Sequence, residues 1–326
     1  MNRFLTLFLV IAAAFTATAA PAGTNWTMAT AYQDTNFHTL NIRQFAEEVQ
    51  RETDGRLNIA VHSGGVRLKM PEIKGGVETG EVQLGEILLS AYGREDPFFE
   101  VDAIPFLTRG QRTAWEVYEL SLPHIEARLK SQGLLALFAV PWPGQGFYTQ
   151  QPVTSTRDFQ GVKFRTYNAT TSRFAELMGA VPIVVQSPGI PEAFSTGRVN
   201  AMITSAATGV DTRAWDFASH YYDVNAMNNK NMVIVNAAAF NELDAEIQRV
   251  VLRAAAKAEA RGWIMSNAVQ AGLTAGLEEN GMTVEPPDPR FLVQLEEIGR
   301  TMFDEWLAGT GERGREFLEA YRALEH

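Results

Sequence analysis

The first ninety residues alternate between short apolar stretches and amphipathic stretches, and this alternation limits the possible folds more than any other feature. Apolar segments at 26–31, 57–61 and 82–89 are predicted to be strands, and the segments 40–53 and 70–79 between them have helical spacing. A β-α-β-α-β order implies a sheet whose strands are joined by helical crossovers. The chain is therefore predicted to be an α/β protein.

A segment rich in proline and glycine divides the chain. Residues 141–146, Pro-Trp-Pro-Gly-Gln-Gly, follow an apolar strand at 134–140, and a new strand begins at Phe147. A chain of 326 residues is long enough for two domains, so we interpret this segment as a crossover between them. The expected limits are 20–145 and 231–270 for domain I, and 146–230 and 271–326 for domain II.

The first nineteen residues have the pattern of a secretory signal peptide. Arg3 gives a positive start, residues 4–15 are apolar, and Ala17-Thr18-Ala19 provides small residues for cleavage. A retained anchor is the alternative, but the apolar run is short for a membrane span. The chain has no cysteine, which excludes disulfides and a lipid-bearing N-terminal cysteine. We expect an exported protein that diffuses freely in a periplasm.

The charge and the missing motifs exclude several classes of function. A net charge of −10 without a run of Lys and Arg argues against nucleic-acid binding. The five histidines lack metal-ligand spacing, and there is no nucleophile elbow, P-loop or complete dinucleotide fingerprint. We therefore expect no metal, no cofactor and no enzymatic activity, with an exported hydrolase as the alternative.

The stretch 161–180 contains the strongest candidate for an anion site. A short strand at 162–166 carries Arg165, a polar turn at 168–172 follows, and an amphipathic helix ends at Gly179. A helix N-terminus offers free N–H groups, and a guanidinium forms a planar fork that matches a carboxylate. A surface arginine on an edge strand is the alternative.

Other candidates lie near the predicted crossover and at strand ends. Ligands of open α/β sheets sit outside the carboxyl ends of strands, and two domains whose strand ends face each other close by a hinge. Taken singly, each aromatic candidate is assigned to the core before the ligand site, but together with the polar candidates they indicate a cleft. The candidates are Trp142, Phe147, Tyr148, Trp215, Asn36, Asn168, Thr204 and Ser205.

Several motifs, in this order and spacing, resemble those of one known family. Residues 159–165, Phe-Gln-Gly-Val-Lys-Phe-Arg, are similar to its L-K-G-L-K-x-R pattern. Residues 102–107 resemble D-x-x-PFL, 178–182 resemble x-G-A-x-P, and 193–201 resemble A-L-x-T-G-x-V-D-G. The family is the solute-binding subunits of tripartite ATP-independent periplasmic (TRAP) transporters, the DctP-like group. The resemblance covers nearly all of the mature chain.

The resemblance implies a fold and a function. The expected fold has two α/β domains, a hinged cleft and a long C-terminal helix that spans both domains. The expected function is capture of an organic acid, as a monomer, and its delivery to small and large integral membrane subunits. The arginine of the K-x-R motif, which is the carboxylate clamp of the family, falls on Arg165. An exported enzyme acting on a small carboxylate, or a binding subunit of another transporter or of a sensor, is the alternative.

The chain departs from the family at two places. Tyr148 stands where sialic-acid-type members have a second arginine, and residues 199–204 lack the common V-D-G-Q-E-N, so that the polar residue falls on Thr204. These departures favour a monocarboxylate with an apolar, aromatic or polyol body. Asn36, Glu86 and Ser90 are expected to contribute from domain I, although Glu86 could instead pair with Arg165 in the empty state.

Overall fold

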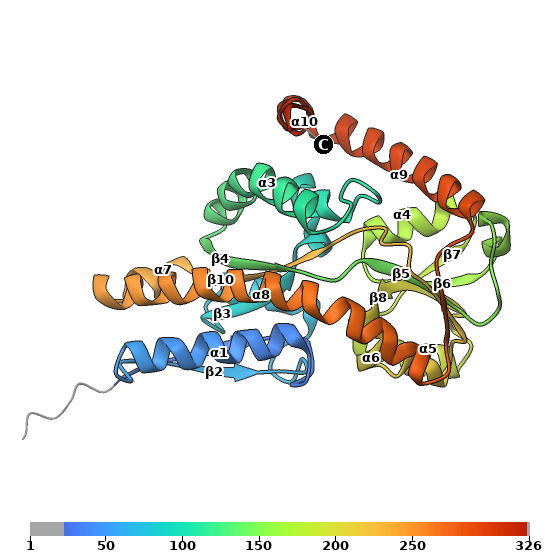
Figure 1. Ribbon diagram of the computed structural model, residues 1–326. Coiled ribbons are helices and arrows are strands. Elements are labelled where there is room, and N and C mark those ends of the chain that lie inside the picture. The colour runs from blue at the N-terminus through green and yellow to red at the C-terminus, as the bar shows by residue number, and fades with distance from the viewer. Residues whose placement is uncertain (1–22, 325–326) are drawn as a thin grey trace, which may run out of the picture.

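The computed structural model describes residues 23–324, so the predicted signal peptide at 1–19 lies outside the described residues. It contains two sheets flanked by helices (Figure 1). The predicted β-α-β-α-β order is confirmed, and β1 pairs in parallel with both β2 and β3. The elements are β1 (Thr24–Ala29), α1 (Phe37–Glu52), β2 (Leu57–His62), α2 (Ile73–Glu78) and β3 (Leu84–Leu88).

The first sheet has the strand order β2-β1-β3-β10-β4. Strand β10 (Lys230–Asn236) lies antiparallel between β3 and β4 (Leu134–Pro141), so a late segment of the chain completes this sheet. Side chains alternate along β10: Val233 and Val235 pack with α1 and α8, whereas Met232 and Ile234 pack with α2 and α3 (Gln111–Ser131). The first sheet is therefore buried on both faces.

The second sheet has the order β11-β9-β5-β8-β6-β7. Its strands are β5 (Gln145–Thr149), β6 (Lys163–Thr166), β7 (Val181–Val184), β8 (Ala201–Ser205), β9 (His220–Tyr222) and β11 (Thr283–Glu285). Its helices are α4 (Ala169–Leu177), α5 (Ile190–Ser195) and α6 (Ala206–Asp211). Short 3-10 helices occur at Met70–Glu72, Leu89–Tyr92, Pro97–Ala103, Thr156–Phe159, Ser187–Gly189 and Ala214–Asp216. The predicted loop at 204–209 is instead the end of β8 and the start of α6, because Ser205 caps that helix.

Two chain segments and one helix connect the sheets. Residues 142–144 lead from β4 to β5, and residues 223–229 lead from β9 back to β10. After α7 (Ala237–Asn241), helix α8 (Ala245–Glu279) contacts α1 and β4 of the first sheet and α6 and β11 of the second (Figure 1). The predicted long helix is thus present and spans both sheets.

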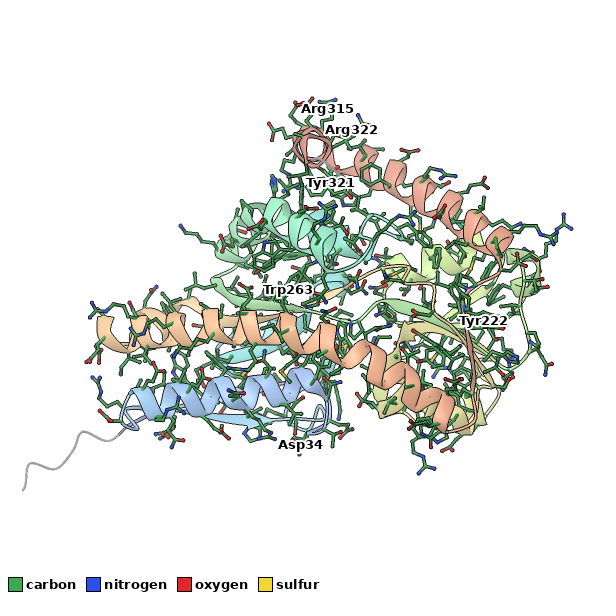
Figure 2. All side chains as sticks on the ribbon, in the orientation of Figure 1. Asp34, Tyr222, Trp263, Arg315, Tyr321 and Arg322 are labelled. Carbon is green, nitrogen blue, oxygen red and sulfur yellow. The ribbon has the colours of Figure 1, made fainter. Side chains whose placement is uncertain are left out.

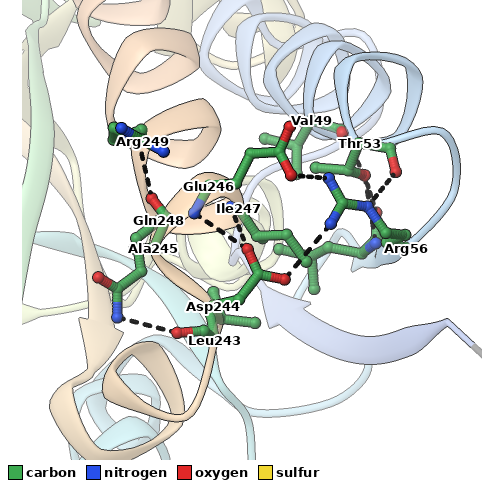
Figure 3. Close-up of polar contacts among 11 residues, drawn as sticks. Val49, Thr53, Arg56, Leu243, Asp244, Ala245, Glu246, Ile247, Gln248 and Arg249 are labelled. Carbon is green, nitrogen blue, oxygen red and sulfur yellow. Dashed lines mark hydrogen bonds and ion pairs between the residues drawn. The ribbon is translucent and has the colours of Figure 1, made fainter.

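The start of α8 is fixed by its cap and by an arginine from the first sheet (Figure 3). The Asp244 carboxylate accepts hydrogen bonds from the backbone N–H groups of Glu246 and Ile247. Arg56, immediately before β2, donates to the carboxylates of Asp244 and Glu246 over 3.4 and 2.7 Å. These contacts hold the first turn of the helix against the edge of the first sheet.

The last two helices return towards the first sheet. Phe291 of α9 (Pro289–Thr310) packs in the core of the second sheet, whereas Trp306 of α9 and Phe317 of α10 (Glu312–Ala323) pack with the α3 side of the first. The domain limits stay a prediction, but α9 and α10 together contact both halves of the protein. The Trp263 side chain points from α8 towards α3 (Figure 2), where its ring contacts Trp115. Its indole N–H donates to the Ala139 carbonyl of β4 over 3.0 Å. Within residues 23–324 no helix is long and apolar enough to cross a membrane.

Candidate ligand-binding site

A cavity with about 370 Å³ of empty space lies where the two sheets meet. It touches the carboxyl ends of β3, β6 and β8, through Leu88, Arg165 and Thr204, as ligand sites in α/β folds do. The full lining is Tyr32, Met70, Leu88, Trp142, Gln145, Arg165, Tyr167, Gln186, Ser187, Thr204, Thr208 and Asn229.

Arg165 is the charged residue of this cavity. Its side chain is 2% exposed, its Nε donates to the Val185 carbonyl over 2.9 Å, and its guanidinium lies 4.9 Å from the centre of the Tyr167 ring. Its Nη1 has no hydrogen-bond partner, and no carboxylate in the described part of the chain forms an ion pair with it. Desolvation lowers the pKa of Arg165 to about 10, so it remains a cation at neutral pH. A buried, unpaired cation is costly, and an anionic ligand would satisfy it.

Tyr167, Gln145 and Asn229, which the sequence did not suggest as site residues, line the cavity together with Arg165. Asn229 Nδ2 donates to the Tyr167 hydroxyl over 2.8 Å, and this hydroxyl lies 3.5 Å from Gln145 Oε1, to which it donates. Burial raises the pKa of Tyr167, which keeps the phenol neutral. Tyr167 follows Arg165 by two residues and could have been suspected on that ground, whereas only the fold brings Gln145 and Asn229 together.

Glu86 does not pair with Arg165, contrary to the alternative considered for the empty state. Its carboxylate accepts hydrogen bonds from Thr30 Oγ1 and from Asn231 Nδ2, the latter over 2.9 Å. Asn231 Oδ1 in turn accepts from the indole N–H of Trp142 over 2.9 Å. Trp142 lines the cavity and Glu86 does not, so Glu86 supports the cavity wall through Asn231.

We predict that Glu86 makes stability depend on pH. Burial raises the pKa of Glu86 to about 7. The folded chain holds the Glu86 proton more tightly than the unfolded chain does. The contribution of protonated Glu86 to the free energy of unfolding is therefore complete below about pH 4.5 and is lost as the pH rises through about 7. The nearby His38 adds no counter-charge, because burial keeps its pKa well below the ordinary value.

The test is the variant Glu86→Gln, which keeps a neutral side chain at every pH. It should exceed the wild type in free energy of unfolding by about 3 kcal/mol at pH 8.5, and the difference should shrink towards pH 5. Urea unfolding across this range measures both values, with Glu47→Gln on the exposed side of α1 as the control. An equal difference at both ends of the range would contradict the prediction.

Asn36, Asn168 and Ser90, which were predicted to contact the ligand, form hydrogen bonds between the two halves of the protein. Asn168 Nδ2 donates to Ser90 Oγ over 2.8 Å, and Asn36 Nδ2 donates to Asp211 Oδ2 over 2.7 Å. Both asparagines also cap helices, Asn168 at α4 and Asn36 at α1, and this capping fixes where their side chains lie. We call the two hydrogen bonds, Asn168–Ser90 and Asn36–Asp211, the cross-cleft bonds.

The remaining predicted residues divide between cavity and core. Trp142 and Thr204 line the cavity with Arg165. Ser205 caps α6 and accepts from the Thr208 N–H over 3.2 Å. The structure does not bring three aromatic candidates to the cavity: Phe147 and Tyr148 are fully buried on opposite faces of β5, and Trp215 packs beside the Tyr148 cluster. The position that would hold a second arginine is therefore in the core.

Comparison with known proteins identifies a family model and several solved structures. The model described as bacterial extracellular solute-binding protein, family 7 (DctP), matches residues 28–309. DctP7 of Bordetella pertussis, an extracytoplasmic solute receptor binding pyroglutamic acid, is 47% identical, with a TM-score of 0.91 over 92% of this chain and 100% of that chain. DctP6 of the same organism, also binding pyroglutamic acid, is 36% identical, with a TM-score of 0.90 and the same coverage.

Two further relatives are similar to the chain. A TRAP solute-binding protein from a marine metagenome, specific for pyroglutamate, is 37% identical, with a TM-score of 0.91 over 93% of this chain and 99% of that chain. A solute-binding protein of Albidiferax ferrireducens is 23% identical over 186 residues, which are 56% of this chain and 54% of that protein. This last match therefore spans about half the length of the relative.

Proposed function

The chain belongs to family 7 of the bacterial extracellular solute-binding proteins, the DctP family, and on this basis we propose that it captures a small organic carboxylate and delivers it to the membrane subunits of a TRAP transporter. Members of this family are extracytoplasmic receptors, so the chain is a solute-binding protein and not an enzyme.

One observation carries the proposal: the small cavity between the sheets contains a buried guanidinium without a carboxylate partner in the described residues. A planar carboxylate can accept two parallel N–H bonds from such a group. In the proposed complex Arg165 binds the carboxylate, while Thr204, Trp142 and Tyr167 surround the remainder of the ligand.

We propose L-pyroglutamate, or a close analogue of it, as the ligand. Three similar receptors, 36–47% identical over more than nine-tenths of the chain, bind pyroglutamate. A monocarboxylate also matches the single arginine that lines the cavity.

A binding assay on the purified chain tests the ligand. Thermal shift followed by calorimetry should show saturable binding of L-pyroglutamate at about micromolar concentration, a range typical of one well-placed ion pair plus a few hydrogen bonds. Succinate and glucuronate, one with two carboxylates and one larger, serve as comparison ligands. Stabilisation by either of them and not by L-pyroglutamate would reject the proposed ligand.

Export and delivery are tested separately from the ligand. We propose that residues 1–19 are removed, and that the mature monomer works in the periplasm with a small and a large integral membrane subunit. Sequencing the exported chain should find a new N-terminus after Ala19. Genes for two such subunits beside the gene for this chain would support the TRAP assignment, and a neighbouring ATPase gene would argue against it.

Because Ser90 forms one of the cross-cleft bonds, we expect it to affect the affinity for every ligand without changing the preference among ligands. Under the proposed hinge mechanism they exist only when the cleft is closed, so Ser90→Ala should weaken every ligand by the same factor, about 2- to 10-fold. Calorimetry with L-pyroglutamate and a weaker acid measures the two affinities and their ratio. Ser131→Ala, whose hydroxyl bonds only within α3, is the control. A changed ratio between ligands would show that Ser90 contacts the ligand instead.

A further inference from the structure

A second buried polar atom without a partner belongs to a residue that lines the cavity, and this atom is an acceptor. Asn229 is 1% exposed and lines the cavity, and its Oδ1 has no hydrogen-bond partner among residues 23–324. Arg165 Nη1, in the same cavity, is a donor without a partner. Buried polar groups are nearly always hydrogen-bonded, so these two atoms together describe what a ligand must offer.

A directed chain of hydrogen bonds favours the amide orientation in which the Asn229 side-chain oxygen is free. It begins at the Pro143 carbonyl, which can only accept, and which accepts from Gln145 Nε2 over 3.3 Å. Gln145 Oε1 must then be an acceptor, and the Tyr167 hydroxyl donates to it. The hydroxyl oxygen can accept in turn from Asn229 Nδ2.

The side-chain oxygen of Asn229 is therefore left as an acceptor. With the amide rotated by half a turn, the Tyr167 hydroxyl would have to donate to Asn229, and its hydrogen bond to Gln145 Oε1 would be lost. The backbone is also held, because the Asn229 carbonyl accepts from the Trp142 N–H over 2.7 Å. The amide thus cannot easily turn away to find another partner.

The lining restricts the kind of donor that can meet this oxygen. No Asp or Glu lines the cavity within the described residues, and Arg165 already supplies a positive charge. An ammonium group would be buried beside a cation without a counter-charge, which is costly. The donor that fits is a neutral N–H or O–H.

We propose that Asn229 determines specificity by accepting a hydrogen bond from a neutral N–H or O–H of the ligand while Arg165 binds its carboxylate. This inference rests on the proposed carboxylate-binding function and narrows its ligand class. The class is small acids with a lactam N–H or a hydroxyl next to the carbon that bears the carboxylate. The lactam of L-pyroglutamate has this arrangement, and zwitterionic amino acids do not.

The test compares two ligands that differ at one atom. L-pyroglutamate carries a ring N–H where 5-oxotetrahydrofuran-2-carboxylate carries a ring oxygen. The wild-type chain should bind the lactone on the order of 100-fold more weakly, because the lactone presents an oxygen to an oxygen. In Asn229→Leu the two affinities should become similar, whereas they should stay far apart in the control Asn228→Ala.

Asn228 is a matched control because its side chain already has its partners. It accepts from Thr108 Oγ1 over 3.3 Å and donates to the Trp142 carbonyl over 3.4 Å. If Asn229→Leu does not fold, Asn229→Asp provides the second test. Its carboxylate should raise the affinity for L-proline relative to L-pyroglutamate, because it supplies the missing counter-charge.

The outcomes separate this inference from the proposed ligand. Equal affinity of the wild type for lactam and lactone would overturn the role of Asn229 even if L-pyroglutamate binds tightly. If L-pyroglutamate does not bind at all, the proposed ligand is wrong. The comparison is then made with lactate and propionate, which differ by one hydroxyl donor. If the chain prefers lactate and Asn229→Leu abolishes this preference, the role of Asn229 is supported. If the preference is unchanged in Asn229→Leu, the role of Asn229 is overturned.

Discussion

Arg165→Ala should reduce the affinity for L-pyroglutamate by about 100- to 10,000-fold while the ligand-free chain stays folded. Two charge-assisted hydrogen bonds of roughly 1.5–3 kcal/mol each give a loss of about 3–6 kcal/mol, which corresponds to that range. The ligand-free chain loses only the bond to the Val185 carbonyl and the contact with Tyr167. The substitution also removes the cost of burying a cation without a counter-charge, which offsets these losses. The melting temperature of the ligand-free chain should therefore change little.

The matched variants separate charge from geometry. Arg165→Lys should also bind poorly, because an ammonium cannot make the planar two-point contact. Arg157→Ala removes an exposed arginine of the same half of the protein and should leave the affinity unchanged. Calorimetry measures the affinities, and thermal unfolding without ligand checks the fold. An Arg165→Ala variant with wild-type affinity would end the clamp hypothesis.

Asp102→Ala should lower the free energy of unfolding by about 3–5 kcal/mol, the usual cost of leaving one member of a buried ion pair alone. Asp102 Oδ2 accepts from the Lys230 backbone N–H over 2.7 Å and lies 3.4 Å from Lys230 Nζ. Desolvation raises the pKa of Asp102 and lowers that of Lys230, and each charge opposes the shift of the other. Without Asp102 the ammonium remains buried and the backbone N–H at the start of β10 loses its acceptor.

Urea unfolding of four variants tests this pair. Lys230→Met alone leaves the carboxylate buried and should also destabilise, whereas the double variant Asp102→Leu/Lys230→Met should recover much of the loss. Asp34→Ala, which removes an exposed ion pair with Arg43, should cost no more than about 1 kcal/mol. If Asp102→Ala is no more harmful than Asp34→Ala, the buried pair does not support the fold as described.

Local patterns in the sequence were enough for much of the fold. Hydrophobic period and turn residues predicted the elements from β1 to β3 and the long helix α8. They also predicted a crossover at 141–146, of which the structure leaves 142–144 between β4 and β5. The position of β10 could not be predicted in this way, because its partners β3 and β4 lie about a hundred or more residues earlier. Only the completed sheet, covered on both faces, explains why every residue of β3 is buried, including Glu86.

The site was predicted less completely than the fold. Arg165, which lines the cavity, was proposed from the sequence because a strand end followed by a helix start is a local signal for an anion site. Asn36 and Asn168 have the same local signal, but it reflects helix capping, and their amide groups bond across the cleft. Asn229 was missed because its neighbours in space, Tyr167 and Gln145, come from other segments of the chain.

The two unpartnered atoms in the cavity also bear on what the empty receptor does. The cross-cleft bonds form between protein residues alone, so they favour closure whether or not a solute is present. Closure without solute leaves Arg165 Nη1 and Asn229 Oδ1 buried without a hydrogen-bond partner. The free-energy cost of burying these two polar atoms opposes closure of the empty receptor. Under the proposed function, the two atoms that bind the solute would also oppose closure of an empty receptor, and therefore its docking to the transporter. Variants that tighten closure should therefore raise affinity and at the same time increase competition by empty receptor for the transporter.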